Sequence, residues 1–507
     1  MELLAFVIYF LAMLTIGLFF FFASRKQSGE KEYFLGGRSM GPWVTAMSAQ
    51  ASDMSGWLLM GLPGSVLAFG FGEVWIGIGL ALGTAANWIF VAKRLRRFSK
   101  AANDSITLPQ YLSNRFATKN PALQIICAII FLVFFTIYVA SSFKAGATVL
   151  STVLPQLKDY ALLIFAAILI VYTFLGGFKA VCWTDFFQGL LMLVALLAIP
   201  IVILAFKDMN LTTLGTTIGD YSFNPNLFGS DWRDIASGLA WGLGYFGMPH
   251  ILVRFMSIKK SSMVKKSATV AIIWVILSLG AAIVIAIFGR ALLGEELLNG
   301  GVVTIFNGKT VELAAGSQEQ IFIVLSRILF PGFIAGLLMS AIIAAAMSTA
   351  DSQLLVASSS FTSDIYKPII RKTASDKETM WVGRITVLVV AVIAYFIANS
   401  EAQGAAAIMN LVSNAWAGFG AAFGPVVILS LFWKRLTYKG AIAGVIAGAV
   451  TDVVWLLLLS EPTGIYELLP GFIVGLIATV VASALDKKPS DEVLSIYAAA
   501  TDKTIDD

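Results

Sequence analysis

The chain has 507 residues, of which 58% are hydrophobic and only 13% are charged, and its formal net charge is +5. Soluble domains are about 45–50% apolar and about 25% charged, so this composition excludes an ordinary soluble enzyme or DNA-binding domain. We interpret the basic excess as the enrichment of Lys and Arg in the cytoplasmic loops of a membrane protein, not as a nucleic-acid surface.

About thirteen apolar stretches are long enough to cross a bilayer as helices, which takes about 20 residues. Lipid offers no hydrogen-bond partner to the backbone, so we predict an all-α polytopic membrane protein. An N-terminus outside and a C-terminus inside places most Lys and Arg on the inner side, as the positive-inside rule requires. The stretches cover approximately 2–24, 42–69, 74–93, 121–153, 158–178, 180–206, 233–258, 268–295, 331–362, 379–399, 404–433, 438–460 and 467–486.

Two of the predicted spans contain residues that interrupt helices. The second span carries "SAQASDMSGW" (48–57) and "GLPG" (61–64), and the seventh carries "AWGLGYFGMPH" (240–250). Gly and Pro weaken a helix and free its carbonyls and amides. Paired broken helices at matching positions indicate a transporter with a site near the midplane of the membrane. The alternative is that these glycines only allow helices to pack closely.

The spacing of the broken spans predicts the domain organisation. They lie five spans apart, so we predict two five-helix repeats that are inverted relative to each other. A single transporter domain would cover 1–486 and a cytoplasmic tail 487–507. Within the domain, an extra first helix covers 2–24, repeat one about 42–206, repeat two about 233–433, and two further helices 438–486.

Polar residues inside the predicted spans point to a cation site. A charged side chain such as that of Asp53 costs about 2.5–3.5 kcal/mol at the bilayer centre, so it normally has a function. Ser348, Thr349, Asp351 and Ser352 form a second cluster. Hard cations favour oxygen ligands, which the carbonyls of the broken span and these hydroxyls can offer. Alternatively, the hydroxyls bond to their own helix, although this does not account for Asp351.

A pocket for an organic substrate is the second predicted feature. Trp241, Tyr245 and Pro249 are spaced i, i+4, i+8, which places them on one side of a helix, and Tyr138 can join them. Aromatic residues with polar groups suit a compact binding pocket. The same stripe is also compatible with ordinary packing.

Several stretches in this order resemble the sodium:solute symporter family, and within it the members that carry proline. The resemblance implies the inverted-repeat fold of the leucine transporter and alternating access driven by a sodium gradient. The stretches are "YFLGGRSMGPWVTAMSA" (33–49), "ASDMSGWLLMGLPG" (51–64), "FFTIYVAS" (134–141), "GGFKAVCWTD" (176–185), "WGLGYFGMPHIL" (241–252), "AAAMSTADSQLLV" (344–356) and "NAWAGFGAAFGPV" (414–426).

The resemblance also implies roles for individual residues. Sodium ligands would be the backbone carbonyls of Ala51, Met54 and Ala345 with the hydroxyls of Ser348 and Thr349. Asp53 matches the family's essential aspartate, which either binds sodium directly or tunes the site and holds the unwound segment. The residues implied to line the proline site are Ser55, Gly56, Tyr138, Trp241, Tyr245 and Pro249.

Asp351 departs from the family pattern, because it stands where the proline carriers have serine. Other family members bind a second cation near this region and an aspartate that matches Asp185. This suggests that Asp185, Asp351 and Ser352 form a second sodium site or a proton-sensitive one. The alternative is that Asp351 caps a helix or forms an ion pair near the cytoplasmic end.

We therefore expect sodium-coupled symport of L-proline across the cell membrane, as in a bacterial inner membrane. No covalent chemistry, nucleic acid or obligate protein partner is expected, and sodium enters as a co-transported ion. One alternative is a sodium- or proton-coupled symporter of the same fold for another small solute. Another is a non-transporting proline sensor, which the short tail disfavours because it leaves no room for a signalling domain.

Overall fold

The computed structural model describes every residue except 25–28, 176, 207–210, 212–213, 401–406 and 503–507. In the described residues, eleven helical segments are long and apolar enough to cross a membrane. Their helices are α1 (Glu2–Ser24), α5 (Val74–Ala86) continued by α6 (Lys93–Ala101), α8 (Ala122–Val153), α9 (Ala161–Leu175), α10 (Phe178–Phe206), α13 (Val264–Leu298), α15 (Gly332–Ser359), α16 (Asp376–Ser400), α17 (Ala407–Phe432), α18 (Tyr438–Leu458) and α20 (Leu468–Leu485).

The two predicted spans with Gly and Pro are interrupted. The first consists of α3 (Pro42–Asp53), a π-helical turn at Trp57–Gly61 and α4 (Leu62–Phe69). Between them Met54 has φ −82° and ψ 77°, which no helix allows. Pro63 lies in the first turn of α4, where a residue without an amide proton is tolerated.

The second interrupted span consists of α11 (Trp232–Ala240), a 3-10 turn at Trp241–Phe246 and α12, which begins at Pro249 and ends at Ser257. Its glycines also permit close packing. A Cβ on Gly244 would lie 2.0 Å from the Trp416 indole nitrogen, and one on Gly247 would lie 2.3 Å from the Phe419 carbonyl oxygen. The break and the close approach, treated as alternatives in the sequence, therefore coexist here.

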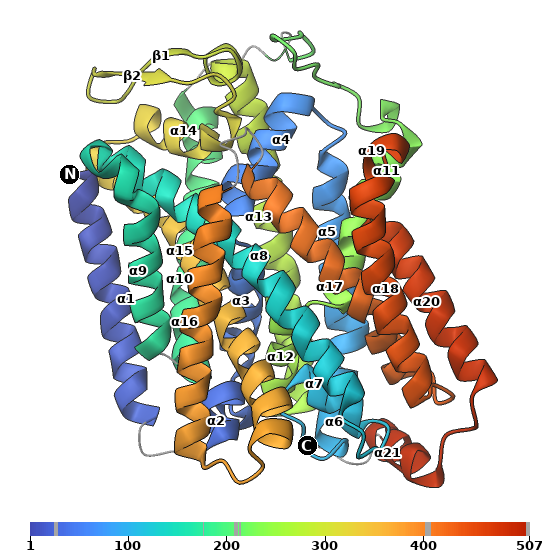
Figure 1. The fold of residues 1–507 in the computed structure, drawn as a ribbon. Helices are drawn as coiled ribbons and strands as arrows, with labels where there is room; N and C mark the ends of the chain where they lie inside the picture. The colour runs from blue at the N-terminus through green and yellow to red at the C-terminus, as the bar shows by residue number, and fades with distance from the viewer. Residues whose placement is uncertain (25–28, 176, 207–210, 212–213, 401–406, 503–507) are drawn as a thin grey trace.

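Short elements cover the two ends of the bundle. At one end lie α14 (Ile321–Leu329) and an antiparallel hairpin of β1 (Gly301–Thr304) and β2 (Thr310–Leu313), in which Val302 pairs with Glu312 (Figure 1). The first residues of α1 lie at this end, and α21 lies at the opposite end (Figure 1). The remaining short helices are α2 (Glu30–Leu35), α7 (Leu108–Asn114), α19 (Ser460–Thr463) and α21 (Asp491–Thr501).

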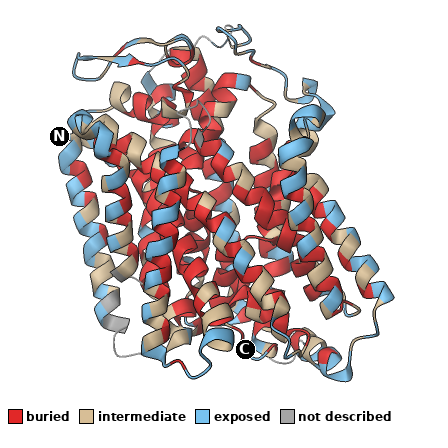
Figure 2. Cartoon of the chain, viewed as in Figure 1, coloured by how far each residue is buried: buried red, intermediate tan, exposed pale blue. Residues whose placement is uncertain are grey.

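Helix α3 lies in the interior of the bundle, where it packs against α10, α12, α13 and α15. Buried residues fill this central region, and exposed side chains lie on peripheral helices such as α1 and α18 (Figures 1 and 2). An apolar outward face suits lipid, and polar groups in the interior must find partners there. The polar residues predicted to bind ligands lie in this interior.

Candidate functional site

Helices α3 and α15 contact each other through the residues predicted to hold a cation. Ser348 Oγ of α15 lies 2.8 Å from the Ala51 carbonyl oxygen of α3 and 3.2 Å from the Ala345 carbonyl oxygen of its own helix. All three residues are buried. Two backbone carbonyls and a hydroxyl therefore converge where α3 approaches its end.

Thr349 and Asp53 add oxygens that have no partner among the described residues. Thr349 Oγ1 is buried without a hydrogen bond, and so is Asp53 Oδ1. Threonine in a helix usually bonds to the carbonyl three or four residues earlier, and Thr349 does not. A buried polar atom without a partner costs free energy unless something else satisfies it. The oxygen-only donor set suits a hard cation such as sodium.

Asp53 is the last residue of α3 and is linked to the second broken helix. The Tyr245 hydroxyl donates to Asp53 Oδ2 at 2.6 Å. The carbonyl of Asp53 accepts from Trp57 Nε1 at 3.3 Å and from the Tyr138 hydroxyl at 3.5 Å. The structure thus brings Asp53, Tyr138 and Tyr245, predicted from three separate spans, into one cluster.

The unwound segment after Asp53 packs closely against α8. A Cβ on Gly56 would lie 2.5 Å from the Cβ of Ala145, so only glycine fits there. Ser55 and Met54 are buried, and the Ser55 amide donates to the Asp53 carbonyl at 3.0 Å. The backbone of the break is therefore held in the interior rather than at the surface.

The predicted aromatic stripe is not one face of a single helix. Trp241 and Tyr245 belong to the 3-10 turn, and Pro249 begins α12 after the chain changes direction. The expectation of one continuous face was wrong because it assumed 3.6 residues per turn across a break. Trp241 and Tyr245 instead share a neighbour in Trp416, with ring centroids 6.4 and 5.0 Å away.

The residues proposed for a second cation lie together around a buried arginine. Arg254 Nη2 is 3.1 Å from Asp185 Oδ2, and the Ser48 hydroxyl donates to the same oxygen at 2.7 Å. The Arg254 guanidinium also donates to Ser352, whose hydroxyl is 3.4 Å from Asp351 Oδ1. Asp185 Oδ1 and Asp351 Oδ2 are buried without a partner among the described residues. The Arg254 guanidinium is thus bonded directly to Asp185 and is linked to Asp351 through Ser352.

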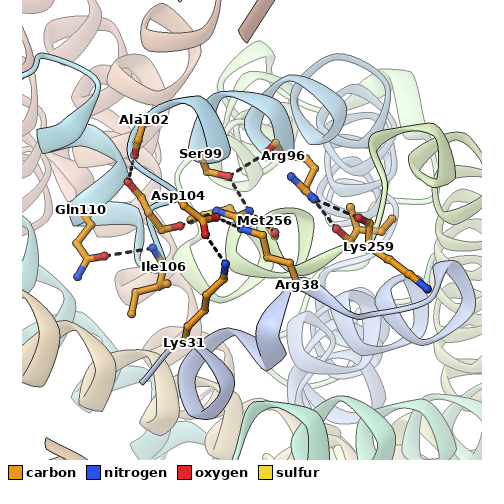
Figure 3. A network of polar contacts seen from close by, with 12 residues as sticks. Lys31, Arg38, Arg96, Ser99, Ala102, Asp104, Ile106, Gln110, Met256 and Lys259 are labelled. Atoms are coloured by element: carbon orange, nitrogen blue, oxygen red, sulfur yellow. Dashed lines mark hydrogen bonds and ion pairs between the residues drawn. The ribbon is translucent and has the colours of Figure 1, made fainter. Parts of the chain in front are cut away.

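A second polar network lies at the end of the bundle that carries α6 and α7 (Figure 3). Arg38 donates to Asp104 at 2.7 Å, to Ser99 at 3.0 Å and to the Met256 carbonyl at 2.5 Å. Lys31 also pairs with Asp104. Burial raises the pKa of Asp104, but the hydrogen bonds and charges of Lys31 and Arg38 outweigh it and hold the pKa below its usual value. This network joins the chain before α3 to the chain after α6 and to α12.

Three residues of these clusters were missed in the sequence. Trp416 donates its indole N–H to the Trp241 carbonyl at 2.8 Å, and Tyr466 stacks on the Trp241 ring at 5.1 Å. Trp416 lies within the family-like stretch 414–426, which was a usable signal. In the sequence, Arg254 is one of several basic residues near the cytoplasmic end of a predicted span. Only the structure shows that its side chain is buried, with 1% exposure.

The sequence of this chain is similar to sequences of known symporters. The model of the sodium:solute symporter family matches residues 33–448. A sodium/proline symporter of Escherichia coli is 45% identical over 503 residues, covering 98% of this chain and 96% of that protein. Sodium/proline symporter 2 of Staphylococcus saprophyticus is 44% identical over 495 residues, covering 95% and 92%.

Solved structures show the same architecture. A sodium-coupled sialic acid symporter in its substrate-bound outward-open state superposes with a TM-score of 0.71 at 21% identity, covering 96% of this chain and 98% of that one. The nucleobase-cation symporter Mhp1, closed around bromovinylhydantoin, gives a TM-score of 0.55 at 14% identity, covering 92% and 98%. Both are leucine-transporter-like folds, as predicted here. From the family match and the full-length identity together, this chain belongs to the sodium:solute symporter family.

Proposed function

We propose that this protein carries L-proline into the cell together with sodium, as a multi-pass protein of the cell membrane. The observation that carries the proposal is the meeting of α3 and α15 at Ala51, Ala345 and Ser348, beside the unpartnered Thr349 hydroxyl. Family members that are 44–45% identical over nearly the whole chain are named sodium/proline symporters. No bond of the substrate is made or broken in such transport.

The sodium site of the proposal consists of the carbonyls of Ala51, Met54 and Ala345 with the hydroxyls of Ser348 and Thr349. Asp53 balances the ion's charge with a carboxylate that is held in place by Tyr245. Because the ligands come from α3 and α15, a bound ion stabilises the arrangement in which these helices are together. Helix α3 lies at the start of the proposed repeat one (about 42–206), and α15 lies within the proposed repeat two (about 233–433).

The proposed proline site lies beside the break in α3. The Gly56 amide of the unwound segment suits the substrate carboxylate, as the amide ends of helices do generally. Ser55 offers its side-chain hydroxyl, because its amide is bonded to the Asp53 carbonyl. Tyr138, Trp241 and Tyr245 offer aromatic surface for the pyrrolidine ring, and Pro249 lies at the start of the next helix. Since Asp53 of the proposed cation site accepts hydrogen bonds from Tyr138 and Tyr245 of the proposed proline site, filling the cation site organises the substrate site.

A second cation site at Asp185, Asp351 and Ser352 is the less direct part of the proposal. It is supported by the unpartnered oxygens Asp185 Oδ1 and Asp351 Oδ2. Arg254 supplies one positive charge against two carboxylates, so a further cation would complete the neutralisation of the cluster.

Sodium coupling gives enough free energy for accumulation. The membrane potential contributes about 2.3 kcal/mol per charge for each 100 mV, so one sodium supports roughly 50-fold accumulation of a zwitterion before its own gradient is counted.

The test is uptake of radiolabelled L-proline into proteoliposomes, with an inward gradient of sodium, potassium or protons. We expect accumulation with sodium alone and its loss in Asp53→Asn. Wild-type uptake of another solute without proline uptake would refute the substrate, and uptake driven only by protons would refute the cation site. Sodium-independent proline binding without uptake would indicate a sensor. For the second site, Asp351→Ser is expected to lower the sodium Hill coefficient, and an unchanged coefficient would refute it.

A further inference from the structure

A groove in the outer surface of the bundle lies between α8, α16 and residues 360–370, the π-helical continuation of α15. Its volume is about 800 Å³. In Figure 1 helices α8 and α16 cross near their upper parts and diverge below, with the continuation of α15 between them. The groove is lined largely by aliphatic side chains, including Leu132, Val133 and Ile137 of α8 and Ile385, Val389 and Ile393 of α16.

The groove lies at the depth of the lipid hydrocarbon. Its lining on α16 extends from Val382 to Ile397, inside a 25-residue helix. At 1.5 Å per residue this is roughly 22 Å, longer than one leaflet of a hydrocarbon core about 30 Å thick. Ile385 and Val389 are 58% and 50% exposed on this outer face. An occupant of the groove must therefore present hydrocarbon.

Two exposed basic residues lie at one end of the groove. Ile370 lines this end, and Arg371 and Lys372 follow it directly, both exposed. Arg371 lies 3.1 Å from Glu378, and the Tyr366 hydroxyl donates to the same carboxylate at 2.6 Å. The sequence assigns this end to the cytoplasmic side. Basic pockets between transmembrane helices on that side bind anionic lipid head groups.

We propose that this groove is a binding site for an anionic phospholipid, with an acyl chain between α8 and α16 and the phosphate held by Arg371 and Lys372. The apolar length selects hydrocarbon, and the two exposed basic side chains select an anionic head group over a zwitterionic one. The bound lipid contacts the continuation of α15, the helix that carries Ser348 and Thr349 earlier in the chain. The site does not depend on which solute the protein transports.

The experiment is native mass spectrometry of the purified full-length protein titrated with phosphatidylglycerol or phosphatidylcholine of matched acyl chains. We expect phosphatidylglycerol to bind more tightly, by about fivefold for each basic residue that contacts the phosphate. Arg371→Gln combined with Lys372→Gln is expected to lower phosphatidylglycerol binding to the phosphatidylcholine level. Val389→Trp fills the groove and is expected to weaken both lipids.

Matched controls separate the site from general effects. Lys487→Gln with Lys488→Gln removes two exposed basic residues of the tail, and Val453→Trp adds the same bulk to the exposed face of α18. Neither control is expected to change binding. If Val389→Trp does not fold, Ile385→Trp replaces it.

Equal binding of the two lipids by the wild type, or binding unchanged in the groove-filling variant, would overturn the proposal. It would also be overturned by a dimer that Val389→Trp dissociates, since the groove would then hold a second copy of the chain.

Discussion

Ser348 of α15 and Ala51 of α3 are 297 positions apart in the sequence, and the Ser348 hydroxyl lies 2.8 Å from the Ala51 carbonyl oxygen. The Ala51 carbonyl lies near the end of α3, where the helix is about to unwind. A contact that needs the break in α3 and the hydroxyl of α15 at once is sensitive to anything that moves either helix. Variants of α15 at this contact are therefore suited to testing sodium binding.

Thr349→Val removes an oxygen and keeps the shape of the side chain. We expect the sodium concentration for half-maximal proline uptake to rise about 10-fold, which corresponds to about 1.4 kcal/mol. Maximal uptake at saturating sodium should change little, because the proposed substrate site is untouched. The measurement is a sodium titration of uptake in proteoliposomes.

The control for this variant is Ser340→Ala. Ser340 is also buried in α15, but its hydroxyl bonds to the Gly336 carbonyl of its own helix at 2.9 Å. Its sodium dependence should match the wild type. Equal sodium dependence of Thr349→Val and the wild type would remove Thr349 from the proposed ligand set.

Tyr245→Phe tests the link between the two broken helices. It removes the hydroxyl that donates to Asp53 Oδ2 at 2.6 Å, leaving a buried carboxylate oxygen without that donor. Such a loss costs about 1–3 kcal/mol. We expect both the sodium and the proline concentrations for half-maximal uptake to rise, because Asp53 belongs to the proposed cation site and Tyr245 to the proposed proline site. Tyr395→Phe on α16 is the control.

A rise in the half-maximal proline concentration alone would contradict the coupling of Tyr245 to the cation site through Asp53. Isothermal titration of sodium binding without proline distinguishes the two outcomes, because it reports the cation site by itself.

Much of the architecture is readable from the sequence because lipid imposes strict rules. Apolar length predicts the spans, and Gly56, Pro63 and Pro249 mark the breaks. The partners across the interior are less readable, since the pairing of Arg254 with Asp185 depends on how α12 and α10 pack. Only the folded chain brings these two groups within 3.1 Å.

The prediction that the aromatic residues share one face of a helix was wrong for a definable reason. The rule that residues i and i+4 share a face holds within an α-helix, and Trp241–Phe246 is a 3-10 turn. Trp416 and Tyr466, which pack on Trp241, come from chain segments far away in the sequence. Periodicity within one segment carries no information about such neighbours.

Arg254→Gln tests whether the buried arginine holds the second cluster together. Removing it leaves Asp185 and Asp351 buried without their cation, and breaking a buried ion pair in this way typically costs about 3–5 kcal/mol. We expect a large drop in the thermal unfolding temperature of the purified protein. Adding Asp185→Asn to Arg254→Gln should restore part of the loss, because one of the two uncompensated charges is then absent.

Arg384→Gln is the control, because Arg384 is only partly buried and lies over the rings of Phe174 and Trp381. If the double variant is no more stable than Arg254→Gln alone, the arginine does not act through Asp185.

Glu319, in the turn before α14, contacts the start of α17 and predicts a pH dependence. The Met409 amide donates to Glu319 Oε1 at 3.3 Å. Burial raises the pKa of Glu319 to about 7, against the opposing hydrogen bonds of the α17 amides and the charge of Lys144. The folded protein thus holds this proton more tightly than the unfolded chain, so the stabilisation is complete below the ordinary pKa and is lost as the pH rises through about 7.

We therefore expect the thermal unfolding temperature to fall between pH 5 and pH 8 in the wild type, and to fall less in Glu319→Gln, which stays neutral. The measurement is thermal unfolding in detergent across this pH range. Glu312→Gln in the exposed hairpin should retain the wild-type slope. A slope that persists unchanged in Glu319→Gln would assign the pH dependence to other groups, since the glutamine keeps the carbonyl that accepts from Met409 and lacks only the titrating proton.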